Sequence, residues 1–162
     1  ISLPDDTVVE GLSPMWTDVD GDGTNEILGT LSNASQGARL VVFGEDGAVV
    51  ALGPPVGMDS RWRHQVAAGL FGPGGEYEVV DVLTPHIGGR VEFFGLDGDR
   101  LNLAGRADAY MSHVIGSRNL DMAAAGDFDA DGRLEVLLPP YPILSALGSM
   151  RHGRQHAARM GN

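Results

Sequence analysis

The sequence predicts an all-β chain built from repeated four-stranded units. The first observation is an Asp-rich segment that occurs twice, because residues 18–28 closely resemble residues 127–137. The second is a β-rich run ending in Asp-Gly, found at 39–47 and again at 90–98. The third is that no stretch with helical periodicity long enough for a helix precedes residue 140. Together these indicate short strands joined by tight turns.

The elements follow the same order in each unit: a strand, an Asp-rich loop, two strands, an Asp-Gly turn and a last strand. The first unit has its loop at 18–28 and its turn at Asp46-Gly47. The second has a worn copy of the loop at 70–80, which keeps Gly75 and Glu78 but has lost all three Asp. Its turn is Asp97-Gly98. The third unit has its loop at 127–137 and stops being a copy after about residue 138.

Residues 139–162 differ in kind from the units. They open with Pro139, Pro140 and Pro142, contain no acidic residue, and carry Arg and His instead. We therefore expect an irregular or disordered tail that is at most weakly helical over 144–160.

A unit of four strands has the size of one β-propeller blade. A single blade cannot bury both of its faces, so neighbouring blades must stack. The sequence thus predicts a partial β-propeller of about three four-stranded antiparallel blades over residues 1–138. Because a closed propeller needs at least about four blades, we expect a fragment of a longer propeller, an open array, or a chain that closes a ring by oligomerising.

Composition excludes several classes of function. The chain has 162 residues, a formal net charge of −11 and no Cys, and all 11 of its cationic residues are Arg. The negative charge disfavours nucleic acid and anionic membranes as partners. The lack of Cys excludes disulfides and thiolate chemistry, and no apolar run is long enough to span a membrane. No charged-then-apolar leader follows the initial Ile, so we expect a removed leader or a piece of a longer chain.

The two intact Asp-rich loops are predicted metal sites. Asp-x-Asp-x-Asp-Gly places carboxylates at positions 1, 3 and 5 of a tight loop, and the Gly lets the chain fold back. Position 7 offers a backbone carbonyl and position 9 a further carboxylate. The predicted ligands of the first loop are Asp18, Asp20, Asp22, Thr24 and Glu26, and those of the second are Asp127, Asp129, Asp131, Arg133 and Glu135.

The predicted ion is Ca²⁺, with two sites in the chain. Oxygen-only ligands in a flexible loop favour Ca²⁺ over Mg²⁺ and Zn²⁺. An EF-hand is excluded, because position 12 is Gly29 or Leu138 and both flanks look like strands. The two loops also hold most of the net negative charge, and a cation would relieve their repulsion. The middle loop has no ligand oxygens at Leu70, Gly72 and Gly74, so we expect a metal-free hairpin held by packing of Leu70 and Phe71.

These residues resemble FG-GAP repeats of the VCBS type, the blade unit of integrin α-chain propellers. The resemblance covers about residues 8–138, and segments 84–89 and 112–118 resemble a bacterial branch of that family. It implies a β-propeller, structural calcium at the Asp-rich loops, and an exported protein in the periplasm or outside the cell. The missing ligands of the middle loop depart from the pattern.

The predicted function is that of a calcium-binding structural or recognition module without catalysis, with a protein or carbohydrate ligand. The alternative is part of a propeller polysaccharide lyase acting on acidic sugars, which would use Arg61, Arg63, His86, His113 or Arg118. An enzyme is the less favoured reading.

Three histidines, His64, His86 and His113, escape the repeat. They are compatible with a zinc or catalytic site, but loop histidines bonded to nearby backbone are commoner. The cluster at 61–64 could stack on a sugar or bind an acidic one, although a Trp packed between blades is commoner. Ser112 and His113 lack a nucleophile elbow, so a serine hydrolase is disfavoured.

Overall fold

The chain folds as three antiparallel four-stranded meanders. The computed structural model describes residues 3–58, 61–142 and 146–159, and within these ranges it contains twelve strands and no helix. The predicted all-β fold is therefore confirmed. The first meander comprises β1 (Val8–Thr17), β2 (Glu26–Asn33), β3 (Gly37–Phe43) and β4 (Val49–Leu52). The second comprises β5 (Arg63–Leu70), β6 (Tyr77–Leu83), β7 (Gly89–Asp97) and β8 (Arg100–Tyr110), and the third β9 (Ala124–Gly126), β10 (Glu135–Leu138), β11 (Ala146–Arg151) and β12 (Arg154–Arg159).

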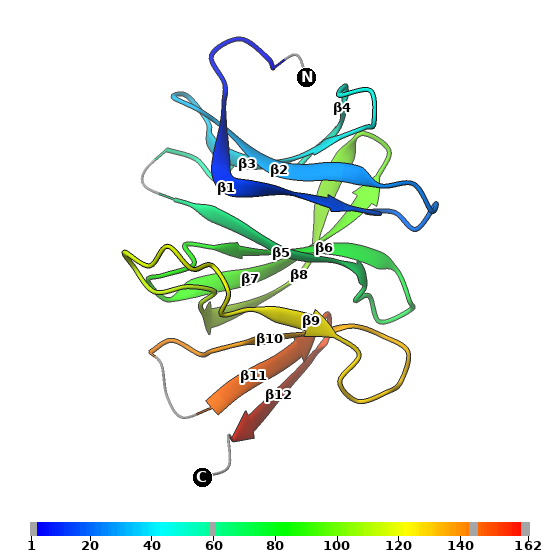
Figure 1. Cartoon of the computed structure of the whole chain (residues 1–162), viewed down its shortest axis with the longest axis vertical. Coiled ribbons are helices and arrows are strands. Elements are labelled where there is room, and N and C mark those ends of the chain that lie inside the picture. The colour runs from blue at the N-terminus through cyan, green and yellow to red at the C-terminus, as the bar shows by residue number, and fades with distance from the viewer. Residues whose placement is uncertain (1–2, 59–60, 143–145, 160–162) are drawn as a thin grey trace.

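The three meanders are stacked as layers along the long axis of the molecule (Figure 1). The chain starts in the layer at one end and finishes in the layer at the other. A single parallel bridge between Leu52 and Arg100 joins β4 to β8, so the first two meanders form one eight-stranded sheet. The third meander is a separate four-stranded sheet.

The strand register confirms the internal repeat. Position 9 of each loop pairs with the residue just before the loop: Glu26 with Thr17, Glu78 with Gly69, and Glu135 with Gly126. The worn segment 70–80 therefore joins the first two strands of its meander as the two Asp-rich loops do. It forms a hairpin in which Phe71 is fully buried, whereas Leu70 is only partly buried.

Successive side chains of a strand point to opposite faces of the sheet, and this alternation builds two cores between the layers. Leu28 and Val42 of the first meander pack with Val79 and Phe94 of the second. The next residue of β6, Val80, points the other way and packs with Val136 of the third meander. β6 is therefore apolar on both faces, because it lies between two layers.

One repeat position shows how the stacking of two meanders buries a side chain. Position 2 of the loops is Val19, Phe71 and Phe128. Val19 is 1% exposed in the core between the first and second meanders, and Phe71 is 0% exposed between the second and third. Phe128 lies on the third meander and is 51% exposed.

The prediction of an irregular or disordered tail over 139–162 is wrong for residues 146–159, and so is the weak helix over 144–160. β11 and β12 pair along their whole length, and β11 also pairs with β10 through Met150 and Val136. The physical reason is tertiary: Met150 is buried in the second core, and this pairing overrides a composition with weak β propensity. Residues 143–145 and 160–162 of the predicted tail lie outside the described residues.

Candidate functional site

The first Asp-rich loop, residues 18–26, is held in a compact turn by its own carboxylates. The Asp18 carboxylate accepts hydrogen bonds from the amides of Gly21 at 2.6 Å and Gly23 at 3.0 Å. Asp22 accepts one from the Thr24 amide at 2.7 Å. Gly23 has a φ of +87°, a conformation that glycine adopts at little cost, which is why this position is Gly.

Three carboxylates meet in this loop. Oxygens of Asp18, Asp20 and Asp22 lie within 4.8 Å of one another. Desolvation opposes ionisation of Asp18, but bonds from four loop amides outweigh it and hold its pKa below the ordinary value. Glu26 is the opposite case, because burial and the charges of the three Asp raise its pKa. The loop therefore concentrates negative charge that no cationic side chain of the described residues is shown to neutralise.

The third-meander loop, residues 127–135, repeats this backbone. The Asp127 carboxylate accepts hydrogen bonds from the amides of Asp131 at 3.1 Å and Gly132 at 2.9 Å. Gly132 has a φ of +85°, close to that of Gly23. Here the acidic oxygens within 4.8 Å of one another belong to Asp127, Asp129 and Glu135.

Arg151 distinguishes the third-meander loop from the first. Its Nη1 atom lies 2.7 Å from Asp131 and 3.3 Å from Glu135. The hydrogen bond from Arg151 is the main reason why the pKa of Asp131 lies below its ordinary value. Asp131 is thus turned towards a cation of the protein itself, and its place in the carboxylate group is taken by Glu135.

The remaining predicted ligands have structural contacts. Glu26 accepts a hydrogen bond from the Val19 amide at 3.1 Å, and Glu135 accepts the equivalent bond from Phe128 at 2.9 Å. The Arg133 guanidinium donates to the Pro73 carbonyl in the turn of the second meander. The structure thus gathers three acidic ligands in each loop, while Glu26 and Asp131 lie outside the two groups of three.

Arg151 and His152 were not predicted as site residues. His152 Nδ1 lies 2.8 Å from the carboxylate of Glu78, the buried middle member of the position-9 acids. The turn between β11 and β12 therefore presents its basic groups to acids of two meanders. The available signal was the charge asymmetry itself, a basic tail without acids after two strongly acidic loops.

Replacing Gly132 by Ala should destabilise the third-meander loop. A Cβ at this position would meet no atom within 4 Å, so the expected loss of about 1–2 kcal/mol comes from the left-handed backbone alone. Gly95→Ala is the matched control, because that site is equally open but has no positive φ. Urea unfolding of both variants measures the difference, and equal stabilities would contradict the argument.

A second group of titratable residues lies outside the repeats. His64 on β5, His86 in the β6–β7 loop and His113 in the β8–β9 loop converge, and we call them the histidine cluster. The ring centroids are 5.7 Å apart for His64 and His113 and 5.2 Å apart for His86 and His113. Trp62 packs against His86 with a centroid distance of 4.8 Å.

The basic–aromatic segment at 61–64 is divided between different roles. Arg63 is buried and forms ion pairs with Asp81 and, at 3.2 Å, with Glu92. It is therefore not available to bind a sugar, contrary to its place in the lyase alternative. Arg61 donates to the Val56 carbonyl at 3.0 Å, and Arg118 is exposed in the β8–β9 loop.

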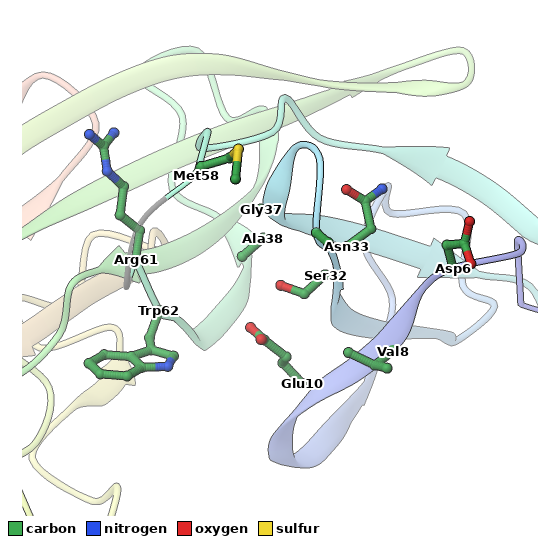
Figure 2. Close-up of a pocket in the computed structure, with 11 residues that line it drawn as sticks. Asp6, Val8, Glu10, Ser32, Asn33, Gly37, Ala38, Met58, Arg61 and Trp62 are labelled. Atoms are coloured by element: carbon green, nitrogen blue, oxygen red, sulfur yellow. The ribbon is translucent and has the colours of Figure 1, made fainter.

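An open cleft of about 540 Å³ lies beside Trp62, between the linker after β4 and the strands β1 and β2. Glu10 and Ser32 point towards the side of the cleft on which Trp62 lies (Figure 2). Trp62 is 47% exposed, so it does not pack between layers as the commoner reading of such a Trp expects. An exposed indole beside hydrogen-bonding groups suits a ligand with an apolar face and a polar edge.

No protein-family model, curated protein or solved structure matches this chain. In the part of the chain that the structure describes, no helix is long and apolar enough to cross a membrane.

Proposed function

We propose that this chain is a calcium-stabilised segment of a β-propeller that acts as a structural and binding module and not as an enzyme. The observation that carries the proposal is the pair of loops at equivalent positions of the first and third meanders. Each has three carboxylates whose oxygens lie within 4.8 Å of one another. Hard oxygen ligands in a loop of this kind favour Ca²⁺.

The layered repeat supports the propeller part of the proposal. Three four-stranded meanders stack face to face through continuous cores, as the blades of a propeller do. Phe128 occupies a position that is buried in the other two meanders, and another sheet stacked on the third meander would cover it. Further repeats or a second copy of the chain could supply that sheet.

The binding part of the proposal is supported by the cleft beside Trp62. Its lining combines the exposed indole with acidic and amide side chains from the first meander. Arg63 is held in buried ion pairs, which removes it from the free basic groups that an acidic-sugar lyase would need at that segment.

A thermal melt in excess calcium and in excess chelator tests the metal part. We expect a clearly higher midpoint in calcium, because a ligand that binds only the folded state stabilises it by about 2.7 kcal/mol at 100 times its dissociation constant. Magnesium at the same concentration is the control for ionic strength and should give a smaller shift. Equal midpoints in calcium and chelator would refute the structural-metal proposal.

Single substitutions show how much each loop contributes to the calcium-dependent shift of the melting midpoint. Asp20→Asn and Asp129→Asn keep the size of the side chain and should each remove part of the calcium-dependent shift. Asp46→Asn, in a turn without clustered acids, is the matched control and should leave that shift unchanged. If Asp20→Asn and Asp129→Asn kept the full shift, the calcium would bind elsewhere.

A further inference from the structure

The histidine cluster has the features of a built site and plays no part in the calcium proposal. Its three members come from β5, from the β6–β7 loop and from the β8–β9 loop by which the chain leaves the second meander. None of them occupies an equivalent position in the repeat, so the architecture alone does not require them. Their convergence within ring distances of 5.2 and 5.7 Å is a property of this chain.

Two ring nitrogens of the cluster lack the partners that buried polar atoms normally have. The Nδ1 atoms of His86 and His113 are buried and accept or donate no hydrogen bond. His86 as a whole is only 9% exposed. Burial without a partner is costly for a polar atom, so an unexplained nitrogen of this kind points to a missing ligand.

The third ring is fixed by a buried hydroxyl. His64 Nδ1 lies 2.6 Å from Ser112 Oγ, and Ser112 is fully buried. This contact orients the ring through Nδ1. The other ring nitrogen, Nε2, takes no part in it. A histidine whose second nitrogen is held by a neighbour is the usual arrangement at metal centres.

The imidazoles of His64 and His113 favour the neutral state that binds metals. Burial lowers the pKa of His64 to about 4, with a smaller contribution from His113. Burial and the proximity of His86 also lower the pKa of His113. Among the described residues no carboxylate forms an ion pair with any of the three, so the cluster is not a charge-balanced ion network.

We propose that His64, His86 and His113 bind a divalent transition-metal ion of the zinc class. Nitrogen ligands favour zinc, cobalt, nickel or copper over calcium, so this site and the Asp-rich loops would select different ions. Within the described residues only the two carboxylate groups hold their ligand atoms within 4.8 Å of one another. The rings of His86 and His113 therefore have to rotate towards the ion, while His64 keeps its contact with Ser112. His64 also lines a cleft of about 340 Å³ between β1 and β5.

The fluorescence of Trp62 gives a direct readout of metal binding to the histidine cluster. The chain has two Trp, so Trp16→Phe leaves Trp62 as the single emitter, 4.8 Å from the His86 ring. Zn²⁺ and Co²⁺ are added to this variant in excess calcium, which keeps the Asp-rich loops occupied. We expect a change in Trp62 emission that saturates at one ion per chain, and visible absorption bands of nitrogen-bound Co²⁺.

The Zn²⁺ affinities of single-residue variants show whether the ion binds at the histidine cluster. His86→Asn and His113→Asn should weaken Zn²⁺ binding by more than the about 10–100-fold loss typical of an outer partner, and Ser112→Ala by about 10–100-fold. His152→Asn removes a histidine that contacts Glu78 and is not part of the histidine cluster, and it should leave the affinity unchanged. Circular dichroism verifies folding, and if His86→Asn fails to fold, the partly buried His113 carries the same test.

Unchanged Zn²⁺ affinity in His86→Asn and His113→Asn would overturn the proposal. An unaltered Trp62 emission at one equivalent of metal would do so as well. Either result leaves the calcium proposal intact, because that proposal is judged by the melt in calcium and chelator.

Discussion

Replacing Arg63 by Met should lower the free energy of unfolding by about 3–5 kcal/mol. The Arg63 side chain is 3% exposed and faces the side chains of Asp81 and Glu92, which are 0% and 7% exposed. Removing the cation leaves Asp81 buried without a counter-charge and Glu92 with only Arg90, at 3.7 Å. Chemical denaturation at neutral pH measures the loss.

Arg90→Met is the matched control for this prediction. Arg90 also approaches Glu92, at 3.7 Å, and pairs with Asp108, but its side chain is 39% exposed. Such a surface pair contributes about 0–1 kcal/mol. Comparable losses in the two variants would show that burial of the ion pair is not the cause.

The pH dependence of the Arg63→Met variant gives an independent check. In the wild-type protein burial raises the pKa of Asp81 to about 7, against the attraction of Arg63. A raised carboxyl pKa favours the folded state below the unfolded pKa, and this contribution is lost as the pH rises through the folded pKa. Without Arg63 the pKa should rise further, so the deficit of the variant should be smaller at pH 5 than at pH 8.

Phe71→Ala should cost about 3–5 kcal/mol, because it empties a fully buried position between the second and third meanders. Phe128→Ala changes the same side chain at the same repeat position, where it is 51% exposed. A surface truncation of this kind should change stability by about 0.5 kcal/mol or less. Thermal or urea unfolding compares the two.

The pair of Phe variants also reports on assembly. If Phe128→Ala were as destabilising as Phe71→Ala, Phe128 would be buried in solution by another sheet. Light scattering at the same protein concentration would then show a mass above that of one chain.

The all-β fold and the positions of the Asp-rich loops could be predicted because their causes are local. The side-chain hydrogen bonds that shape the loop at 18–26 join residues no more than seven apart. The Asp-Gly turns are equally local, and Gly47 and Gly98 both have positive φ in the structure. A sequence motif contains nearly all the information that such a turn needs.

The histidine cluster and the last two strands could not be derived in this way. His64, His86 and His113 meet only because two loops of the second meander fold onto one strand, which no spacing rule predicts. β11 and β12 contain Gly, Ser, Arg and His, and they form strands because β10 offers an unpaired edge. The basic residues at their turn then find acids on two meanders, a contact that depends on the finished stack.

The meander topology has a consequence for how the chain reaches its native state. Among the described residues, strands pair only with their neighbours in sequence, apart from the bridges between Leu52 and Arg100 and between Tyr110 and Pro140. The entropy of closing a loop grows with its length, and β proteins dominated by distant pairings are the slow folders. This chain can form one hairpin at a time, and each finished meander offers the next a surface on which to condense. During synthesis, the first meander can therefore be complete before the second has left the ribosome.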